Sequence, residues 1–166
     1  MNARPAPRDV HVERMRFAVI VSEYHAFVTD GLEAGARAVL SESGAVADRV
    51  ARFVVPGAFE LAPAAQRVAE RGGFSAVICL GCLIRGETPH FDYIAQAAAH
   101  GIMRAAMETG VPIAFGLLTT NTVDEALARS VEGTANKGRE AATAALAMAT
   151  LYEQLDEAPA GAGNEP

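Results

Sequence analysis

The sequence predicts one α/β domain, a three-layer α/β/α sandwich around a mainly four-stranded parallel sheet. Short apolar runs alternate with segments whose apolar residues repeat at helical spacing. The short runs are apolar on both faces, as in parallel strands that helices cover on both sides. Right-handed crossovers between such strands place the helices in two outer layers. A chain of 166 residues suits one compact domain with a real core, and no internal repeat is visible.

Four apolar runs are the expected strands, and stretches of helical periodicity separate them. The strands are expected at Phe17–Ser22, Ala51–Val55, Ala76–Leu80 and Pro112–Leu118. Glycines mark several of the expected helix ends, and Thr122 with Glu125 forms a capping box at one helix start. The helices are expected at about Val28–Leu40, Phe59–Glu70, Asp92–Thr109, Val123–Ser130 and Gly138–Leu155.

The two ends of the chain do not continue these patterns. Residues 1–14 carry prolines and mixed charges without a period, which predicts a flexible N-terminal arm. Residues 157–166 are rich in Ala, Gly and Pro, which predicts a disordered C-terminal tail. The folded domain is therefore expected over residues 15–156.

The composition argues against some classes of partner. A formal charge of −6 and a pI near 5.2, without a basic stripe, argue against nucleic acid. No apolar stretch is long enough to cross a bilayer, and we find no N-terminal signal pattern, so we expect a cytoplasmic protein without a membrane partner. The hydrophobic content of 51%, beside 20% charged residues, predicts apolar surface that is buried between subunits.

Cys79 and Cys82 form a C-x-x-C spacing that has two interpretations. A redox pair needs both sulfurs close together, usually at a helix N-terminus. Here the pair lies on an expected strand, where residues three apart point to opposite faces. We therefore expect small apolar residues in a buried strand, with a redox or binding module as the alternative.

The segment from Gly81 to Tyr93 is the strongest candidate for a site. An apolar run ends in a glycine-broken turn, and His90 and Asp92 follow as a helical pattern begins. Open α/β sheets bind ligands where strands end and helices start. A histidine there can exchange protons near neutral pH, although a solvated histidine at a helix start is the alternative. Asp92 could orient His90 only if the backbone bends.

Backbone groups and two other strand ends add to this site. The N–H groups of Gly86, Glu87 and Thr88 stand just ahead of a helix and can hold an anion such as phosphate. Glu60, in the turn after the second strand, could accept hydrogen bonds from ligand hydroxyls or could simply favour the helix dipole. Tyr24, after the first strand, could stack on a flat ring or be a half-buried aromatic residue. Three such ends at one sheet edge predict a shared pocket.

Phe115, Arg129 and Lys137 stand apart from these turns in the sequence. Taken alone, the two charges are most simply solvated surface groups, but the Arg129 fork would suit phosphate. A metal site is not expected, because the four histidines, His11, His25, His90 and His100, show no ligand spacing with acids or cysteines.

Together, these features resemble the lumazine synthase family of riboflavin biosynthesis. The resemblance covers nearly the whole chain, from about Phe17 to Leu151, and its motifs occur in order at family-like spacing. They are Pro56-Gly57-Ala58-Phe59-Glu60, then Leu80-Gly81-Cys82-Leu83-Ile84-Arg85-Gly86-Glu87-Thr88 with His90, then Phe115-Gly116 with Thr119-Thr120, and Asn136-Lys137-Gly138.

The resemblance implies a flavodoxin-like fold and a transferase that needs no metal or organic cofactor. It condenses 5-amino-6-(D-ribitylamino)uracil with 3,4-dihydroxy-2-butanone 4-phosphate to give 6,7-dimethyl-8-ribityllumazine, phosphate and water. The family forms homopentamers, and some members assemble twelve pentamers into an icosahedral shell of sixty subunits. A short loop between Arg129 and Lys137 is similar to that of shell-forming members, whereas Pro5 and Pro7 could disrupt contacts between pentamers.

The resemblance also implies a role for each candidate residue. His90 shuttles protons, Tyr24 stacks on the uracil ring, and Glu87 and Thr88 bind the phosphate through N–H groups. Cys82, Leu83 and Ile84 meet the pyrimidine edge largely through backbone, and Ala58, Phe59 and Glu60 line the ribityl arm. A neighbouring subunit supplies Phe115, Arg129 and Lys137, with Arg129 reaching the phosphate.

This chain departs from the family pattern after the first strand. Many relatives have Arg-Phe-Asn where Glu23-Tyr24-His25 stands here. Pro89 fixes its own φ and restricts Thr88, which stiffens the expected phosphate turn. These departures leave a second hypothesis open: a lumazine- or flavin-binding paralogue with weak or no catalysis.

Overall fold

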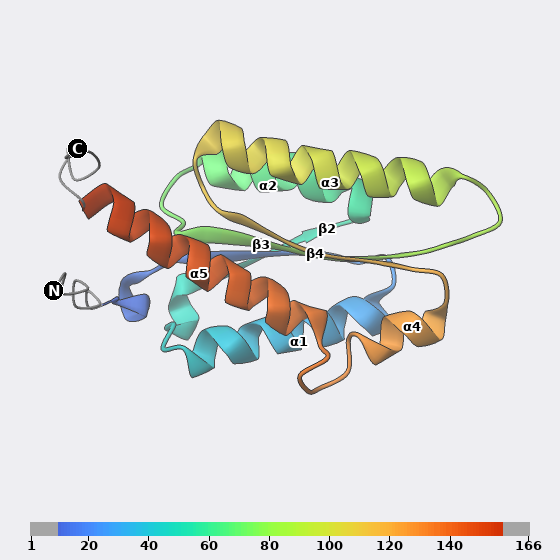
Figure 1. The fold of residues 1–166 in the computed structure, drawn as a ribbon, viewed down its shortest axis with the longest axis horizontal. Helices are drawn as coiled ribbons and strands as arrows, with labels where there is room; N and C mark the ends of the chain where they lie inside the picture. Colours follow the sequence, from blue (N-terminus) through green and yellow to red (C-terminus); the bar gives the residue numbers. More distant parts are fainter. Residues whose placement is uncertain (1–9, 158–166) are drawn as a thin grey trace, which may run out of the picture.

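The computed structural model describes residues 10–157, which form a four-stranded, all-parallel sheet between two layers of helices (Figure 1). The strand order is β2-β1-β3-β4, so the chain starts near the middle of the sheet and builds outward in both directions. This is the α/β sandwich that the alternating pattern predicts. The strands are β1 (Phe17–Ser22), β2 (Val50–Val55), β3 (Ala76–Ile84) and β4 (Ile113–Thr120).

Helices cover both faces of the sheet. Helices α2 and α3 lie on one face, whereas α1, α4 and α5 lie on the other (Figure 1). The helices are α1 (Ala26–Glu42), α2 (Leu61–Glu70), α3 (His90–Thr109), α4 (Val123–Ala128) and α5 (Lys137–Glu157). Residues 10–157 also form three short 3-10 helices: η1 (Val12–Arg14), η2 (Ala47–Arg49) and η3 (Ala58–Glu60).

The sheet separates two hydrophobic cores, and β1 serves both. Phe17 and Val19 pack toward α1 and α5, whereas Ala18 and Ile20 pack toward α2 and α3. All six residues of β1 are buried. A run that is apolar on both faces therefore predicts this central strand correctly, because successive side chains enter opposite cores.

Strand β3 is longer than expected, and the prediction of a glycine-broken turn at Gly81 is wrong. The strand continues to Ile84, which pairs with Thr120 of β4. A Cβ at Gly81 would stand 2.9 Å from Leu61 Cδ1 and 3.0 Å from Leu117 Cδ1. The glycine is thus required by close packing within the strand, and it does not end it.

The helix boundaries differ from the expected ones by a few residues. Helix α3 begins at His90, two residues earlier than expected, and α4 ends at Ala128, before Ser130. The expected helix start at Phe59 is a 3-10 turn that leads into α2.

Cys79 and Cys82 lie in different cores, on opposite faces of β3. Both thiols are buried, and burial raises the pKa of Cys79 to about 12 and that of Cys82 to about 11. The expectation of small residues in a buried strand is confirmed, since a dithiol pair would need both sulfurs on one face.

The expectations for the chain ends fall mostly outside the described residues. Residues 1–9 of the expected arm and 158–166 of the expected tail lie there. Val12–Arg14 forms the turn η1, and Val10 and Val12 pack against the core beside α1 and α5. Within residues 10–157, no helix combines the length and the apolar character that crossing a bilayer requires.

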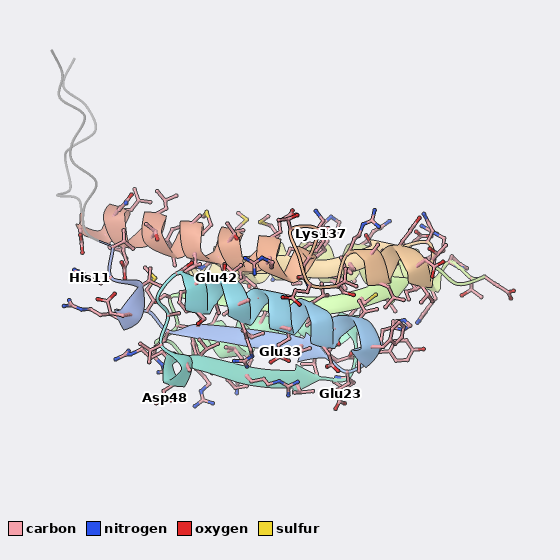
Figure 2. All side chains as sticks on the ribbon, turned by 90° about the horizontal axis from the view of Figure 1, so that it is seen from below. His11, Glu23, Glu33, Glu42, Asp48 and Lys137 are labelled. Atoms are coloured by element: carbon pink, nitrogen blue, oxygen red, sulfur yellow. The ribbon has the colours of Figure 1, made fainter. Side chains whose placement is uncertain are left out.

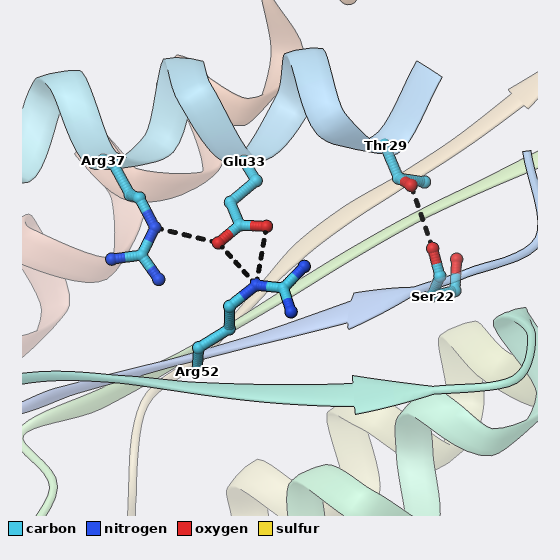
Figure 3. Close-up of polar contacts among 5 residues, drawn as sticks. All are labelled: Ser22, Thr29, Glu33, Arg37 and Arg52. Carbon is cyan, nitrogen blue, oxygen red and sulfur yellow. Dashed lines mark hydrogen bonds and ion pairs between the residues drawn. The ribbon is translucent and has the colours of Figure 1, made fainter. Parts of the chain in front are cut away.

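Polar contacts fix the start of α1 against the sheet (Figure 3). The Thr29 hydroxyl donates a hydrogen bond to the Ser22 carbonyl at 2.9 Å. One turn further on, Glu33 accepts hydrogen bonds from Arg37 and from Arg52 of the edge strand β2. The bond from Thr29 to Ser22 spans the loop between β1 and α1, which carries Tyr24 and His25, and the Glu33 contacts hold α1 against β2.

Candidate functional site

A large cavity lies where β1, β2 and β3 end, at the edge where the chain passes into α1, η3 and α3. Its volume is about 900 Å³, enough for a ligand of two fused rings with a side chain. Three separate loops build it, as the shared-pocket prediction requires. We call it the first pocket; it is lined by Tyr24, His25, Gly57, Ala58, Phe59, Glu60, Cys82, Leu83, Ile84, Gly86, Thr88, His90, Phe91, Tyr93, Ile94 and Val123.

Backbone hydrogen bonds hold two walls of the first pocket together. The Glu23 N–H donates to the Val55 carbonyl at 2.9 Å, and the Tyr24 N–H donates to the Pro56 carbonyl at 3.1 Å. These bonds extend the β1–β2 pairing past the ends of both strands. Tyr24 consequently stands beside the 57–60 turn with an exposed ring that is free to stack on a ligand.

His25 adopts the left-handed conformation with φ of 63°, which non-glycine residues rarely occupy. Its ring lies edge-on to Tyr24, with centroids 4.5 Å apart, and edge-on to Phe27 at 5.6 Å. Partial burial lowers the pKa of the imidazole below its usual value. Strained residues of this kind cluster at binding sites, and the His25 side chain lines the first pocket.

The turn from Gly86 to Pro89 forms the outer rim of the first pocket and leads into α3. Within residues 10–157, the N–H groups of Gly86, Glu87 and Thr88 have no hydrogen-bond partner, so they are free to bind an anion. Gly86 and Thr88 line the cavity, whereas Glu87 stands outside its lining. His90 is the first residue of α3 and is exposed at the rim.

Asp92 does not pair with His90; it pairs with Arg85. Arg85 Nη2 lies 2.9 Å from Asp92 Oδ1, and Nη1 lies 3.1 Å from Oδ2. These hydrogen bonds hold the pKa of the Asp92 carboxyl below its usual value. A guanidinium fork matches a carboxylate far better than one imidazole nitrogen does, which explains the partner that Asp92 takes.

Phe115, Arg129 and Lys137 lie together in a separate, smaller cavity. This second pocket has a volume of about 300 Å³ and is formed between β4 and the first turns of α5. Lys137 stands at the start of α5, on the face of the molecule that α1 and α5 cover (Figure 2). A single chain thus gathers most of the expected site residues into two groups, and these three do not line the first pocket.

The loop that carries Arg129 and Lys137 is anchored by Asn136, which sequence reasoning did not single out. The residue is buried, and its Nδ2 donates hydrogen bonds to the Ser130 carbonyl at 2.8 Å and to the Gly31 carbonyl at 3.0 Å. Its Oδ1 accepts hydrogen bonds from the first N–H groups of α5. Only its position in the Asn-Lys-Gly motif drew attention to it in the sequence.

Sequence reasoning assigned no role to four residues that line the first pocket: Phe91 and Tyr93, which lie in the expected site segment, and Ile94 and Val123, which lie outside it. Tyr93 and Ile94 lie three and four residues after His90, so they share its side of the helix. The sequence predicts a helix start at Asp92, which leaves His90 outside the helix, so the prediction does not place these residues on one side with it. Within residues 10–157, no group of three His, Cys, Asp or Glu side chains could hold a metal ion.

Comparison with known proteins gives one consistent answer. Residues 14–153 match the family model for 6,7-dimethyl-8-ribityllumazine synthase. The chain is also 48% identical to 6,7-dimethyl-8-ribityllumazine synthase of Salinibacter ruber over 148 residues, covering 89% of this chain and 95% of that protein. Both matches include the two pockets and the loops that build them. The chain therefore belongs to the 6,7-dimethyl-8-ribityllumazine synthase family.

Proposed function

We propose that this protein catalyses the family reaction with a site that two neighbouring subunits share. The reaction condenses 5-amino-6-(D-ribitylamino)uracil with 3,4-dihydroxy-2-butanone 4-phosphate to form 6,7-dimethyl-8-ribityllumazine, phosphate and water. The observation that carries the proposal is the first pocket, whose lining combines aromatic residues, a histidine and a turn with N–H groups that no group within residues 10–157 uses.

The pyrimidine substrate is assigned to the inner part of the first pocket. The exposed Tyr24 ring stacks on the uracil, and Ala58, Phe59 and the half-buried Glu60 line the ribityl chain. The Cys82 side chain is buried in the core, so Cys82, with Leu83 and Ile84, meets the pyrimidine edge mainly through backbone groups. Stacking and backbone contacts orient the amine for attack, which is the main contribution of such a site.

The butanone phosphate is assigned to the rim. The N–H groups of Glu87 and Thr88 bind the phosphate, because no other group within residues 10–157 uses them. The substrate amine attacks the ketone and forms an imine with loss of one water, the phosphate leaves, and ring closure releases a second water. His90 moves protons between these steps from its position at the helix start.

The remaining groups come from a neighbouring subunit in this proposal. Phe115, Arg129 and Lys137 lie together in the second pocket and do not line the first. Docking the second pocket of one subunit against the first pocket of the next brings Arg129 to the phosphate. Each subunit then gives one half-site and receives another, as in a closed ring. We propose a homopentamer, located in the cytoplasm.

Exposed apolar side chains support an oligomer. Large apolar residues lie at the surface of α3, the β4–α5 region and α5, and a monomer would expose them to water. They include Met103, Met107, Phe115, Leu127, Val131, Met148, Leu151 and Leu155.

The reaction is tested by mixing the purified protein with both substrates and following the absorbance and fluorescence of the lumazine product. Native mass measurement of the same sample gives the state of assembly. We expect clear acceleration over the spontaneous condensation. Tight lumazine binding without acceleration would reject the enzyme and leave a binding paralogue.

The shared site is tested by subunit complementation. At a low concentration of the butanone phosphate, a His90→Ala chain and an Arg129→Ala chain should each retain at most about a tenth of the wild-type activity. When they are co-assembled at equal amounts, about one quarter of the interfaces should combine an intact His90 with an intact Arg129 from different subunits. Activity should therefore return. Two inactive variants that stay inactive after mixing would place both residues in one chain's site.

A further inference from the structure

Arg85 contacts both the loop that leads into α3 and the segment that leads to Arg129. Its N–H donates to the Thr120 carbonyl at 2.9 Å, which ties the end of β3 to the end of β4. Its guanidinium forms the two-pronged pair with Asp92 and lies 4.3 Å from the centre of the Phe91 ring. The fork therefore closes the loop that starts at Arg85 and returns at the first turn of α3.

That loop contains the phosphate turn and His90. Within residues 10–157, the side chains of Glu87, Thr88 and His90 have no hydrogen-bond partner that could hold the loop from inside. The Arg85–Asp92 pair is thus the main polar contact across the loop. Fixing both ends of an exposed loop reduces the conformations that it must lose when a ligand binds.

The same guanidinium also reaches the part of the chain that carries Arg129. Arg85 Nε lies 3.3 Å from Asn121 Oδ1, and the Asn121 N–H donates to Glu125 Oε2 at 2.8 Å. The Glu125 carbonyl in turn accepts a hydrogen bond from Arg129 Nη1 at 2.9 Å. A continuous polar chain therefore joins Asp92 to Arg129 through α4.

We propose that Arg85 is a positioning residue that fixes the phosphate turn and the Arg129 segment through one polar network. The inference rests on the proposed function and deepens it, because each end of the network holds a group assigned to phosphate. In the ring of subunits, the two ends serve adjacent sites. The network consequently links the geometry of one site to that of the next.

A contribution to the stability of the fold does not by itself explain the Arg85–Asp92 pair. The side chains of Arg85 and Asp92 are 43% and 47% exposed, and ion pairs at such exposure contribute little to global stability. The expected loss is therefore in phosphate recognition, with the fold intact. This difference separates a positioning role from a structural one.

The test compares Arg85→Met, Arg85→Lys and Asp92→Asn with the wild type. The KM for the butanone phosphate should rise about tenfold in Arg85→Met, while that for the pyrimidine should change less than about twofold. Arg85→Lys keeps the charge but not the fork, so it should stay impaired. The Arg85→Met/Asp92→Asn double variant should be no worse than either single variant, because both changes remove one contact.

Two further measurements make the result decisive. Asn121→Ala removes only the bridge to α4 and should raise the same KM about threefold. Arg104→Met is the control, since it removes an exposed ion pair with Glu108 near the far end of α3. It should match the wild type in both KM values. The midpoint of thermal unfolding should change by less than about 2 °C in all of these variants.

The inference is overturned if Arg85→Met binds phosphate normally, or if both KM values rise together with a clear drop in the unfolding midpoint. A wild type that forms no lumazine would contradict the proposed function, not this network. In that case, the Kd for inorganic phosphate, measured by calorimetry, still tests the positioning role of Arg85. Arg85→Met should weaken that Kd about tenfold, and an unchanged Kd would reject the positioning role.

Discussion

Gly35 of α1 lies directly against the buried amide of Asn136. A Cβ built on Gly35 would overlap Asn136 Oδ1 and stand 2.6 Å from its Cγ. The missing side chain therefore makes room for the residue that anchors the 130–136 loop. This loop separates Arg129 from Lys137, so a glycine on α1 helps to set the position of two proposed ligand groups.

Gly35→Ala should destabilise the protein, although the same change inside a helix ordinarily stabilises it by about 1 kcal/mol. Overpacking at a buried contact costs about 1–3 kcal/mol, and displacing Asn136 breaks further hydrogen bonds. We expect a net loss of about 2 kcal/mol in denaturant unfolding. Ala34→Ser, at the exposed neighbouring position, is the control and should change little. A more stable Gly35→Ala variant would contradict the close approach.

The sequence was sufficient for the layers and for most of the strands, because burial on both faces leaves a local mark. Every residue from Phe17 to Ser22 is buried, and the apolar run has the same bounds as β1. Gly81 misled the prediction, because a glycine that ends a strand and one that makes room for Leu61 look alike in sequence. The difference depends on residues of other elements.

The candidate site also has features that the sequence predicts and features that only the structure shows. The three strand-end turns could be placed at one edge from parallel-sheet geometry alone. The partner of Asp92 could not, since both His90 and Arg85 are near it in sequence and only the geometry of the turn selects Arg85. Asn136 and Gly31 are 105 residues apart, so no local pattern records their contact.

Arg129→Ala should mainly impair use of the butanone phosphate. A charge-assisted hydrogen bond contributes about 1.5–3 kcal/mol, so kcat/KM for this substrate should fall about 10- to 100-fold. The KM for the pyrimidine should change little, and Arg129→Lys should recover part of the loss. The measurement is steady-state kinetics with each substrate varied in turn. Wild-type kinetics in Arg129→Ala would contradict the assignment of this residue to the phosphate.

His90→Ala should reduce turnover more than binding. General acid–base groups contribute about 100- to 10,000-fold, and the spontaneous condensation sets a floor under the loss. We therefore expect kcat to fall at least about 100-fold. Binding of the lumazine product, measured by fluorescence, should weaken only modestly, because Tyr24 and the pocket walls remain. Equal losses in product binding and turnover would instead assign His90 to binding.

His25 should make the folded protein less stable as the pH falls from 8 to 5. Its pKa is lowered from the usual 6.5 by burial, so the unfolded chain binds protons that the folded chain does not. Stability is therefore full above the unfolded pKa and is lost as the pH falls through the folded pKa. His25→Asn removes this term and tolerates the left-handed backbone. Unfolding midpoints measured across this pH range should show a shallower slope for the variant; equal slopes would contradict the prediction.

The two cysteines should be inert in the folded protein. Their raised pKa values, about 12 for Cys79 and about 11 for Cys82, leave almost no thiolate at pH 8, and both side chains are buried. Iodoacetamide should label neither cysteine in the native state and both after unfolding, as read by mass spectrometry.

Because the Cys82 side chain is buried, substituting it tests whether the pocket contacts the pyrimidine through the backbone of this residue. If the backbone of Cys82 does the binding, Cys82→Ala leaves the contacting atoms in place. Its KM for the pyrimidine should then stay within about twofold of the wild type. Mild oxidation should also leave activity unchanged, because the sulfurs lie in separate cores and cannot form a bond. Activity that is lost on oxidation and recovered with a reductant would mean that β3 opens to expose both thiols, and would revive the redox alternative.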